Sequence, residues 1–122
     1  MDPQKTEGLK ENLKMFQKTF RLAGVSFNNA QKNIRTFGNA DIGSYALVRE
    51  PDNPLDPNAI KVMLVGVVFL GYVPREIAEE LALLLDQGKQ FMAFFVSLNR
   101  HPYKSTIGLT VRIEEYPCEA AA

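Results

Sequence analysis

Oxygen-bearing side chains are concentrated between residues 50 and 58, where Glu50, Asp52 and Asp56 stand among asparagines and prolines. Hard divalent cations prefer such oxygen ligands, so a metal-dependent nuclease is one candidate chemistry. The spacing argues against it, because an EF-hand calcium loop needs alternating ligands, a central glycine and a final glutamate. Neither a second acidic cluster nor a suitable catalytic His or Lys is evident. We therefore expect no metal and no cofactor.

The sole histidine, His101, and the sole cysteine, Cys118, are the other candidates for catalysis. His101 falls in a polar segment, Asn99 to Ser105, that is predicted to be a loop, and no orienting partner for a triad can be recognised. Cys118 has no identifiable activating neighbour. Both observations favour a protein that is not an enzyme. A lone cysteine also excludes an intramolecular disulfide and favours a reducing cytoplasm.

The charges of the chain are balanced, with 14 Lys plus Arg against 14 Asp plus Glu in 122 residues. No overall positive field exists to hold a polyanion, so any contact with nucleic acid must be local. The longest mainly apolar stretch, residues 60 to 73, is interrupted by Lys61 and is too short to cross a bilayer as a helix. No secretory signal is recognisable at the start either. We expect one domain and no membrane partner.

Two helices are predicted around these polar residues. Ala30–Phe37 follows two asparagines and is closed by Gly38. The second helix begins at Pro74, which suits a first helical position, and ends at Gly88. Its expected buried stripe consists of Ile77, Leu81, Leu84 and Leu85.

Six strands are predicted from alternation and from β-branched runs. They are Phe20–Phe27, Tyr45–Arg49, Ala59–Leu64, Val67–Val73, Phe91–Leu98 and Thr106–Ile113. This order predicts a mainly β fold, a small six-stranded barrel with embedded helices. We expect an N-terminal extension that is partly helical over residues 1–19, the barrel over residues 20–114 and a flexible tail over residues 115–122.

Two motifs carry a family resemblance. The run from Leu47 to Val62 contains Arg-Glu-Pro-Asp-Asn-Pro-Leu-Asp-Pro-Asn-Ala-Ile, and Gly71 to Pro74 reads Gly-Tyr-Val-Pro before a helix. Joined in this order, and preceded by Leu22 to Phe27, they resemble the HIRAN domain over roughly residues 20 to 114. The resemblance implies an OB-like barrel that occurs alone in prokaryotes and their viruses or fused to helicase-like enzymes. In fused eukaryotic members it binds the 3′ end of single-stranded DNA.

The resemblance assigns roles residue by residue. Asp56 accepts a bond from the terminal 3′-hydroxyl, Asn58 and Tyr72 support the end nucleotide, and Phe27 stacks on a base. The cations expected to face phosphates are Arg49, Lys61 and Arg75. Simpler interpretations stay open: the Asp and Asn are turn residues, the aromatic rings pack in the core, and the cations are solvated.

The chain departs from the family's aromatic platform at two places. Eukaryotic DNA binders carry two adjacent tyrosines after the first strand, where this chain has Phe27 and Asn28, and a tyrosine before the key aspartate, where it has Leu55. Leucine offers no π face for stacking, so the platform is reduced.

We therefore expect a non-catalytic module for single-stranded DNA ends in DNA repair or replication-fork processing, acting with a helicase or nuclease. The alternative is a protein-protein interaction module of a larger DNA-processing complex. Alternation places Phe91 and Phe95 on one face of a strand and Phe94 on the other, so at least one ring needs a second layer or a partner. Dependence of DNA affinity on Phe27 and Asp56 separates the two hypotheses.

Overall fold

The computed structural model describes residues 16–65 and 67–116. Within these residues, six strands and two helices follow one another. They are β1 (Gln17–Arg21), α2 (Ala30–Phe37), β2 (Ala46–Arg49), β3 (Ile60–Leu64), β4 (Val68–Tyr72), α3 (Arg75–Asp86), β5 (Gln90–His101) and β6 (Lys104–Tyr116).

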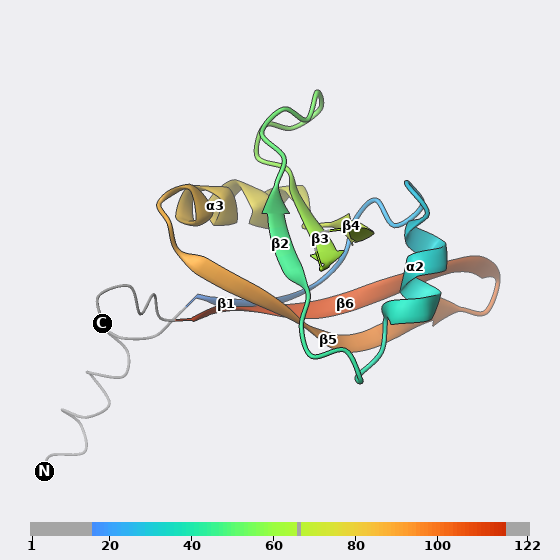
Figure 1. Ribbon diagram of the computed structural model, residues 1–122. Helices are drawn as coiled ribbons and strands as arrows, with labels where there is room; N and C mark the ends of the chain where they lie inside the picture. The colour runs from blue at the N-terminus through green and yellow to red at the C-terminus, as the bar shows by residue number, and fades with distance from the viewer. Residues whose placement is uncertain (1–15, 66, 117–122) are drawn as a thin grey trace, which may run out of the picture.

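The strands form two antiparallel sheets of three, ordered β1-β6-β5 and β2-β3-β4. Isolated bridges join Ala23 to Tyr72 and Tyr45 to Ala93, so the sheets meet at both sides without a continuous ladder. Figure 1 shows β2 and β3 crossing over the long β5–β6 pair, with α3 and α2 toward opposite ends. The mainly β, OB-like class is confirmed, and the barrel is not closed by strand pairing within the described residues.

The core fills the space between the sheets with alternate strand residues and one side of each helix. Tyr45 is its largest fully buried side chain, 1% exposed, and its hydroxyl donates to the Phe37 carbonyl at 2.8 Å. This bond satisfies a polar group that would otherwise be costly to bury. Ile34 supplies the contact from α2, and Leu81 supplies that from α3.

Helix α3 follows the sequence prediction closely. It begins at Arg75, with Pro74 immediately before it, and Gly88 takes a left-handed φ of 93° just beyond its end. Ala78, Leu81 and Ala82 are buried. The rest of the predicted stripe packs partly buried against the core: Ile77, Leu84 and Leu85.

The predicted first strand is placed wrongly. Strand β1 begins at Gln17, so residues 17–19 are strand and not part of a helical extension, and it ends at Arg21. Leu22 is still buried, but the next residue, Ala23, already bridges to Tyr72 of the other sheet. Gly24 then adopts a φ of 63° and starts a turn that Phe27 closes. Residues 1–15 of the predicted extension, and Cys118 with residues 117–122, lie outside the described residues.

The predicted loop from Asn99 to Ser105 is also wrong. Strands β5 and β6 continue through it, and His101 pairs with Lys104, which leaves only Pro102 and Tyr103 in the turn. The polar composition suggested a loop. These polar residues instead lie on exposed or half-exposed strand positions, which need no apolar side chain.

Candidate functional site

An open groove of about 280 Å³ lies where the loop between β2 and β3 meets the segment after β1. In Figure 1 the β2–β3 loop projects beyond the body of the fold above β3. The lining consists of Ala23, Phe27, Asn53, Leu55, Asp56, Ala59, Tyr72, Val73 and Arg75. Apolar walls and a few polar groups are typical of binding sites.

The β2–β3 loop is shaped by its own side chains. The Asn53 Oδ1 atom accepts bonds from the backbone N–H groups of Leu55 at 2.8 Å and Asp56 at 3.1 Å. The Asp56 Oδ1 atom in turn accepts from the backbone of Asn58 at 2.9 Å. Such bonds are the usual means by which Asx residues stabilise turns. The turn-forming role expected for Asp56 is therefore present, and it occupies one of its two carboxylate oxygens.

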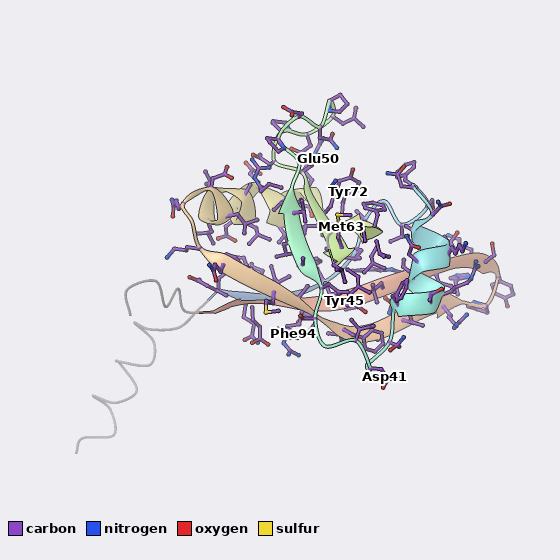
Figure 2. The ribbon with its side chains drawn as sticks, viewed as in Figure 1. Asp41, Tyr45, Glu50, Met63, Tyr72 and Phe94 are labelled. Carbon is purple, nitrogen blue, oxygen red and sulfur yellow. The ribbon has the colours of Figure 1, made fainter. Side chains whose placement is uncertain are left out.

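Glu50 holds the base of this loop to the sheet below it. Its Oε1 atom accepts from Asn53 Nδ2 at 2.6 Å and from the Tyr72 hydroxyl at 2.8 Å, while Oε2 lies 3.5 Å from Lys61 Nζ. Figure 2 shows Glu50 and Tyr72 close together under the loop. The Asn53 bond, with smaller contributions from Tyr72 and Lys61, lowers the pKa of Glu50 below its usual range. Burial, with the neighbouring Glu50, raises the pKa of Tyr72.

Asp56 and Arg75 place opposite charges side by side in the groove. Arg75 Nε lies 3.6 Å from Asp56 Oδ2, and its Nη2 donates to the Leu55 carbonyl at 2.9 Å. The Asp56 side chain is 18% exposed and that of Arg75 is 69% exposed. The guanidinium is thus mostly hydrated, while the carboxylate is sheltered in the lining. The pair offers a ligand one acceptor and one exposed cation.

The aromatic part of the groove consists of Phe27 and Tyr72. Phe27 is 62% exposed, so the alternative that it packs in the core is wrong. Tyr72 is half-buried and meets Phe69 edge-on, with ring centroids 5.2 Å apart. Gly24 separates the two rings: a Cβ there would lie 3.0 Å from Tyr72 Cδ2 and 3.5 Å from Phe27 Cδ2. Because Gly24 has no Cβ and can adopt a φ of 63°, the turn can hold the Phe27 ring toward solvent.

Three of the predicted site residues do not line the groove. Arg49 binds the Asp86 carboxylate through Nε at 3.0 Å and Nη2 at 3.2 Å, and Nη1 donates to the carbonyls of Pro57 and Ala59. It therefore braces the loop against α3. Lys61 pairs with Glu50. Asn58 contacts the loop through its backbone N–H, which donates to Asp56. The structure brings together the other four: Phe27, Asp56, Tyr72 and Arg75.

Several contributors were not predicted. The sequence suggests Glu50 as a metal ligand and as a charge that opposes the nearby cations, whereas its role as an anchor needs Tyr72, which is 22 residues away. Asn53 had a usable signal, because an asparagine before proline is typical of a turn. The partner of Arg49, Asp86, is 37 residues distant, and its sequence neighbourhood gives no indication of the contact.

The candidates for metal binding and catalysis can be located in the part of the chain that the structure describes. Across residues 16–65 and 67–116, no group of three or more His, Cys, Asp or Glu is arranged to hold a metal ion. His101 is exposed, and its Nδ1 accepts from the Tyr103 backbone at 3.0 Å. No helix in those same ranges is long and apolar enough to span a membrane.

The phenylalanines of β5 are used inside the domain. Phe91 is buried and meets Phe16 edge-on at 5.6 Å, and Phe95 packs against the core. Phe94 lies on the other face, where the Arg112 guanidinium stacks 5.4 Å from its ring centre. The predicted alternation of this strand is confirmed, and a cation provides the cover that Phe94 needed.

The two sheets and their groove define a small OB-like binding domain. The HIRAN domain model matches residues 18–115. This chain belongs to the HIRAN domain family, as the two sequence motifs indicated.

Curated relatives share short segments with this chain. A Fanconi-associated nuclease 1 homolog from Oryza sativa is 51% identical over 47 residues, which are 36% of this chain. A helicase-like transcription factor from Oryctolagus cuniculus is 51% identical over 41 residues, or 34% of the chain. The matches cover 5% and 4% of the length of these relatives.

Two solved structures share the fold. A protein from Lactobacillus plantarum aligns with a TM-score of 0.64 at 24% identity, covering 84% of this chain and 96% of that one. The HIRAN domain of human HLTF aligns with a TM-score of 0.55 at 20% identity, covering 81% and 74%. Similarity at this level of identity establishes the architecture only.

Proposed function

We propose that this domain is a non-catalytic module that binds single-stranded DNA at a free 3′ end. The observation that carries the proposal is the groove, in which the exposed ring of Phe27 lies on the same lining as the Asp56–Arg75 pair. A terminal 3′-hydroxyl can donate to a carboxylate, and an internal nucleotide has no free 3′-hydroxyl to offer. Membership of the HIRAN family supports a role in DNA processing.

Within this proposal each groove residue has a distinct role. Asp56 Oδ2 accepts the bond from the 3′-hydroxyl, and Arg75 turns from the carboxylate toward the adjacent phosphate. Phe27 stacks on a base, and Tyr72 with Leu55 packs against the end nucleotide. Asn58, Arg49 and Lys61 contribute by holding the loop in shape, since each has a partner within the domain.

The wider setting is part of the same proposal. Relatives named as a nuclease homologue and as helicase-like transcription factors contain matching segments, so we infer that the domain acts with a helicase or nuclease in repair or fork processing. A cytoplasmic location stays a prediction from the single cysteine.

Fluorescence anisotropy tests the proposal with short strands that carry a 3′-hydroxyl, a 3′-phosphate or no end. We expect the hydroxyl strand to bind best, and Asp56→Asn to abolish its advantage over the 3′-phosphate strand. Phe27→Ala should weaken binding by about 1 to 3 kcal/mol, the usual value of one stacked base. Asp52→Asn, in the same loop but outside the groove lining, and Leu83→Ala, an exposed apolar residue of α3, are the matched controls. Equal binding of all three strands, unchanged by the groove substitutions, would refute end recognition.

A further inference from the structure

A second hollow, of about 320 Å³, lies at the other end of β3 from the groove. It is lined by residues 44–47, by Leu64 and Val65 at the end of β3, and by Phe91 and Met92 at the start of β5. None of these lining residues carries a charge. Phosphates are bound mainly by lysine and arginine, so this lining does not suit nucleic acid and favours an apolar occupant.

The hollow opens where the two sheets are joined by one bridge alone. Tyr45 and Ala93 exchange both of their backbone hydrogen bonds, at 2.7 and 3.1 Å. Figure 1 shows β2 and β5 diverging from this crossing toward α3, and within the described residues no ladder joins them. Because bonding groups alternate along a strand, the backbone groups of Leu47 and Phe91 face the same gap as those of the bridged pair. We refer to the hollow and these two strand edges as the β2–β5 seam.

The rim of the seam carries an exposed and strained valine. Val65 is 82% exposed at the β3–β4 turn and has a φ of 55°. This left-handed region favours glycine and asparagine, and a β-branched residue there is strained. Val67, on the other side of the turn, is 79% exposed. Asparagine would suit both the backbone and the solvent better, so the apolar side chains at this turn indicate a contact.

The chain enters the described fold beside the seam. The ring of Phe16 meets that of Phe91 edge-on, with centroids 5.6 Å apart, and Phe91 lines the hollow. Fifteen residues of the sequence precede Phe16, and Leu9 and Leu13 are apolar residues among them. Strands β1 and β5 are separated only by β6, which places them about 10 Å apart. Seven extended residues span up to about 25 Å, so residues 9–15 are long enough to reach the seam.

We propose that residues 9–15 of this chain occupy the β2–β5 seam and place Leu9 and Leu13 over the hollow. Apolar side chains suit the uncharged lining. The tether at Phe16 gives the segment an effective concentration in the millimolar range, so weak contacts suffice to hold it. The inference is independent of the groove and of DNA binding, because the seam lies at the other end of β3. It assigns to this segment the cover of a gap that the two sheets leave between them.

Amide hydrogen exchange in the full chain, resolved by NMR, tests whether the seam is covered. Leu9→Asp combined with Leu13→Asp should speed exchange of the Leu47 and Phe91 amides at least tenfold, because charged side chains would leave the apolar hollow. Exchange that is equally fast in the native chain and in this variant overturns the proposal.

Two controls accompany this measurement. Gln4→Asp combined with Asn12→Asp adds the same two negative charges at polar positions of the segment, and it should change the exchange rates less than twofold. The Tyr45 amide, bonded to the Ala93 carbonyl, shows whether the fold itself has loosened, and its rate should stay the same in both variants.

A disulfide then locates the segment. In chains that carry Cys118→Ser, Leu13→Cys is combined either with Ala46→Cys, at an exposed position of the hollow, or with Lys89→Cys. We expect the disulfide with Ala46→Cys to form at least tenfold faster. Equal or faster formation with Lys89→Cys contradicts docking in the seam.

Lys89 is a stringent control because it lies beside the point where the segment enters the fold. Its Nζ atom is 3.6 Å from Glu115 Oε2, and the Glu115 backbone donates to the Phe16 carbonyl at 3.0 Å. A segment without a preferred site would therefore reach Lys89→Cys at least as readily as the hollow. A disulfide that links two chains, or exchange protection that grows with protein concentration, assigns the seam to a second copy and overturns the proposal.

Discussion

Replacement of Glu50 by glutamine is the most informative perturbation of the domain, because this side chain joins the β2–β3 loop to the sheet. Glutamine keeps an oxygen that can accept from Asn53 and Tyr72 but loses the charge and the ion pair with Lys61. Bonds to a charged acceptor contribute about 1.5 to 3 kcal/mol, and neutral ones about 0.5 to 1.5. Loss of charge should thus cost about 1 kcal/mol for each bond, and the half-exposed ion pair adds about 0.5 kcal/mol.

These contributions sum to an upper value of about 2.5 kcal/mol in the free energy of unfolding at pH 7. Because 29% of the Glu50 side chain is exposed, solvent screening reduces the expected cost to about 1 to 2 kcal/mol. Denaturation in urea, followed by circular dichroism, measures it. Glu79→Gln provides the matched control, since Glu79 is exposed on α3 and should change stability by less than about 0.5 kcal/mol.

The pH dependence gives a second, independent readout. The pKa of Glu50 is lowered in the folded state, so its ionised form contributes stability above its unfolded pKa, near 4.5. That contribution is lost as pH falls from this value through the folded pKa. The stability difference between the native chain and Glu50→Gln should therefore shrink at acidic pH. A variant as stable as the native chain at pH 7, or a difference that persists unchanged in acid, refutes the assigned role of Glu50.

Three further substitutions test other parts of the structure. Gln31→Ala removes three bonds, to Val25 and to both backbone groups of Ile107, and should lower the free energy of unfolding by about 2 to 3 kcal/mol in urea denaturation. Gly24→Ala forces a left-handed φ on alanine close to an aromatic ring, so a loss of about 1 to 2 kcal/mol in thermal unfolding is expected, and no loss contradicts the tight turn. Leu81→Ala empties a fully buried site and should cost about 2 to 5 kcal/mol.

The sequence predicts the elements well where apolar periodicity is decisive. Helix α3 is located correctly because its buried residues recur at the helical period, and the β3–β4 hairpin because each of its strands is a short, β-branched apolar run. The first strand is misplaced because Leu22 continues the apolar alternation beyond Arg21 and is itself buried. Alternation reports burial and does not show where a strand loses its ladder partner.

The site is predicted only in part for a similar reason. A local motif identifies Asp56 and Arg75, and both line the groove. The same motif suggests phosphate contacts for Arg49, which the fold instead directs to Asp86 on α3. Nothing near an arginine in the sequence determines which distant carboxylate will reach it. Charge type is thus readable from the chain, whereas pairing is a property of the tertiary structure.

Strand β1 pairs with the end of β6 that is most distant in sequence, with Gln17 opposite Glu114, and the Glu115 backbone donates to the Phe16 carbonyl at 3.0 Å. The two ends of the described fold therefore lie next to each other. A domain with adjacent ends can be inserted into a surface loop of a host protein without separating the strands that flank the insertion. For the same reason, a short linker between these ends should permit circular permutation, with new termini at the exposed turn of Pro102 and Tyr103.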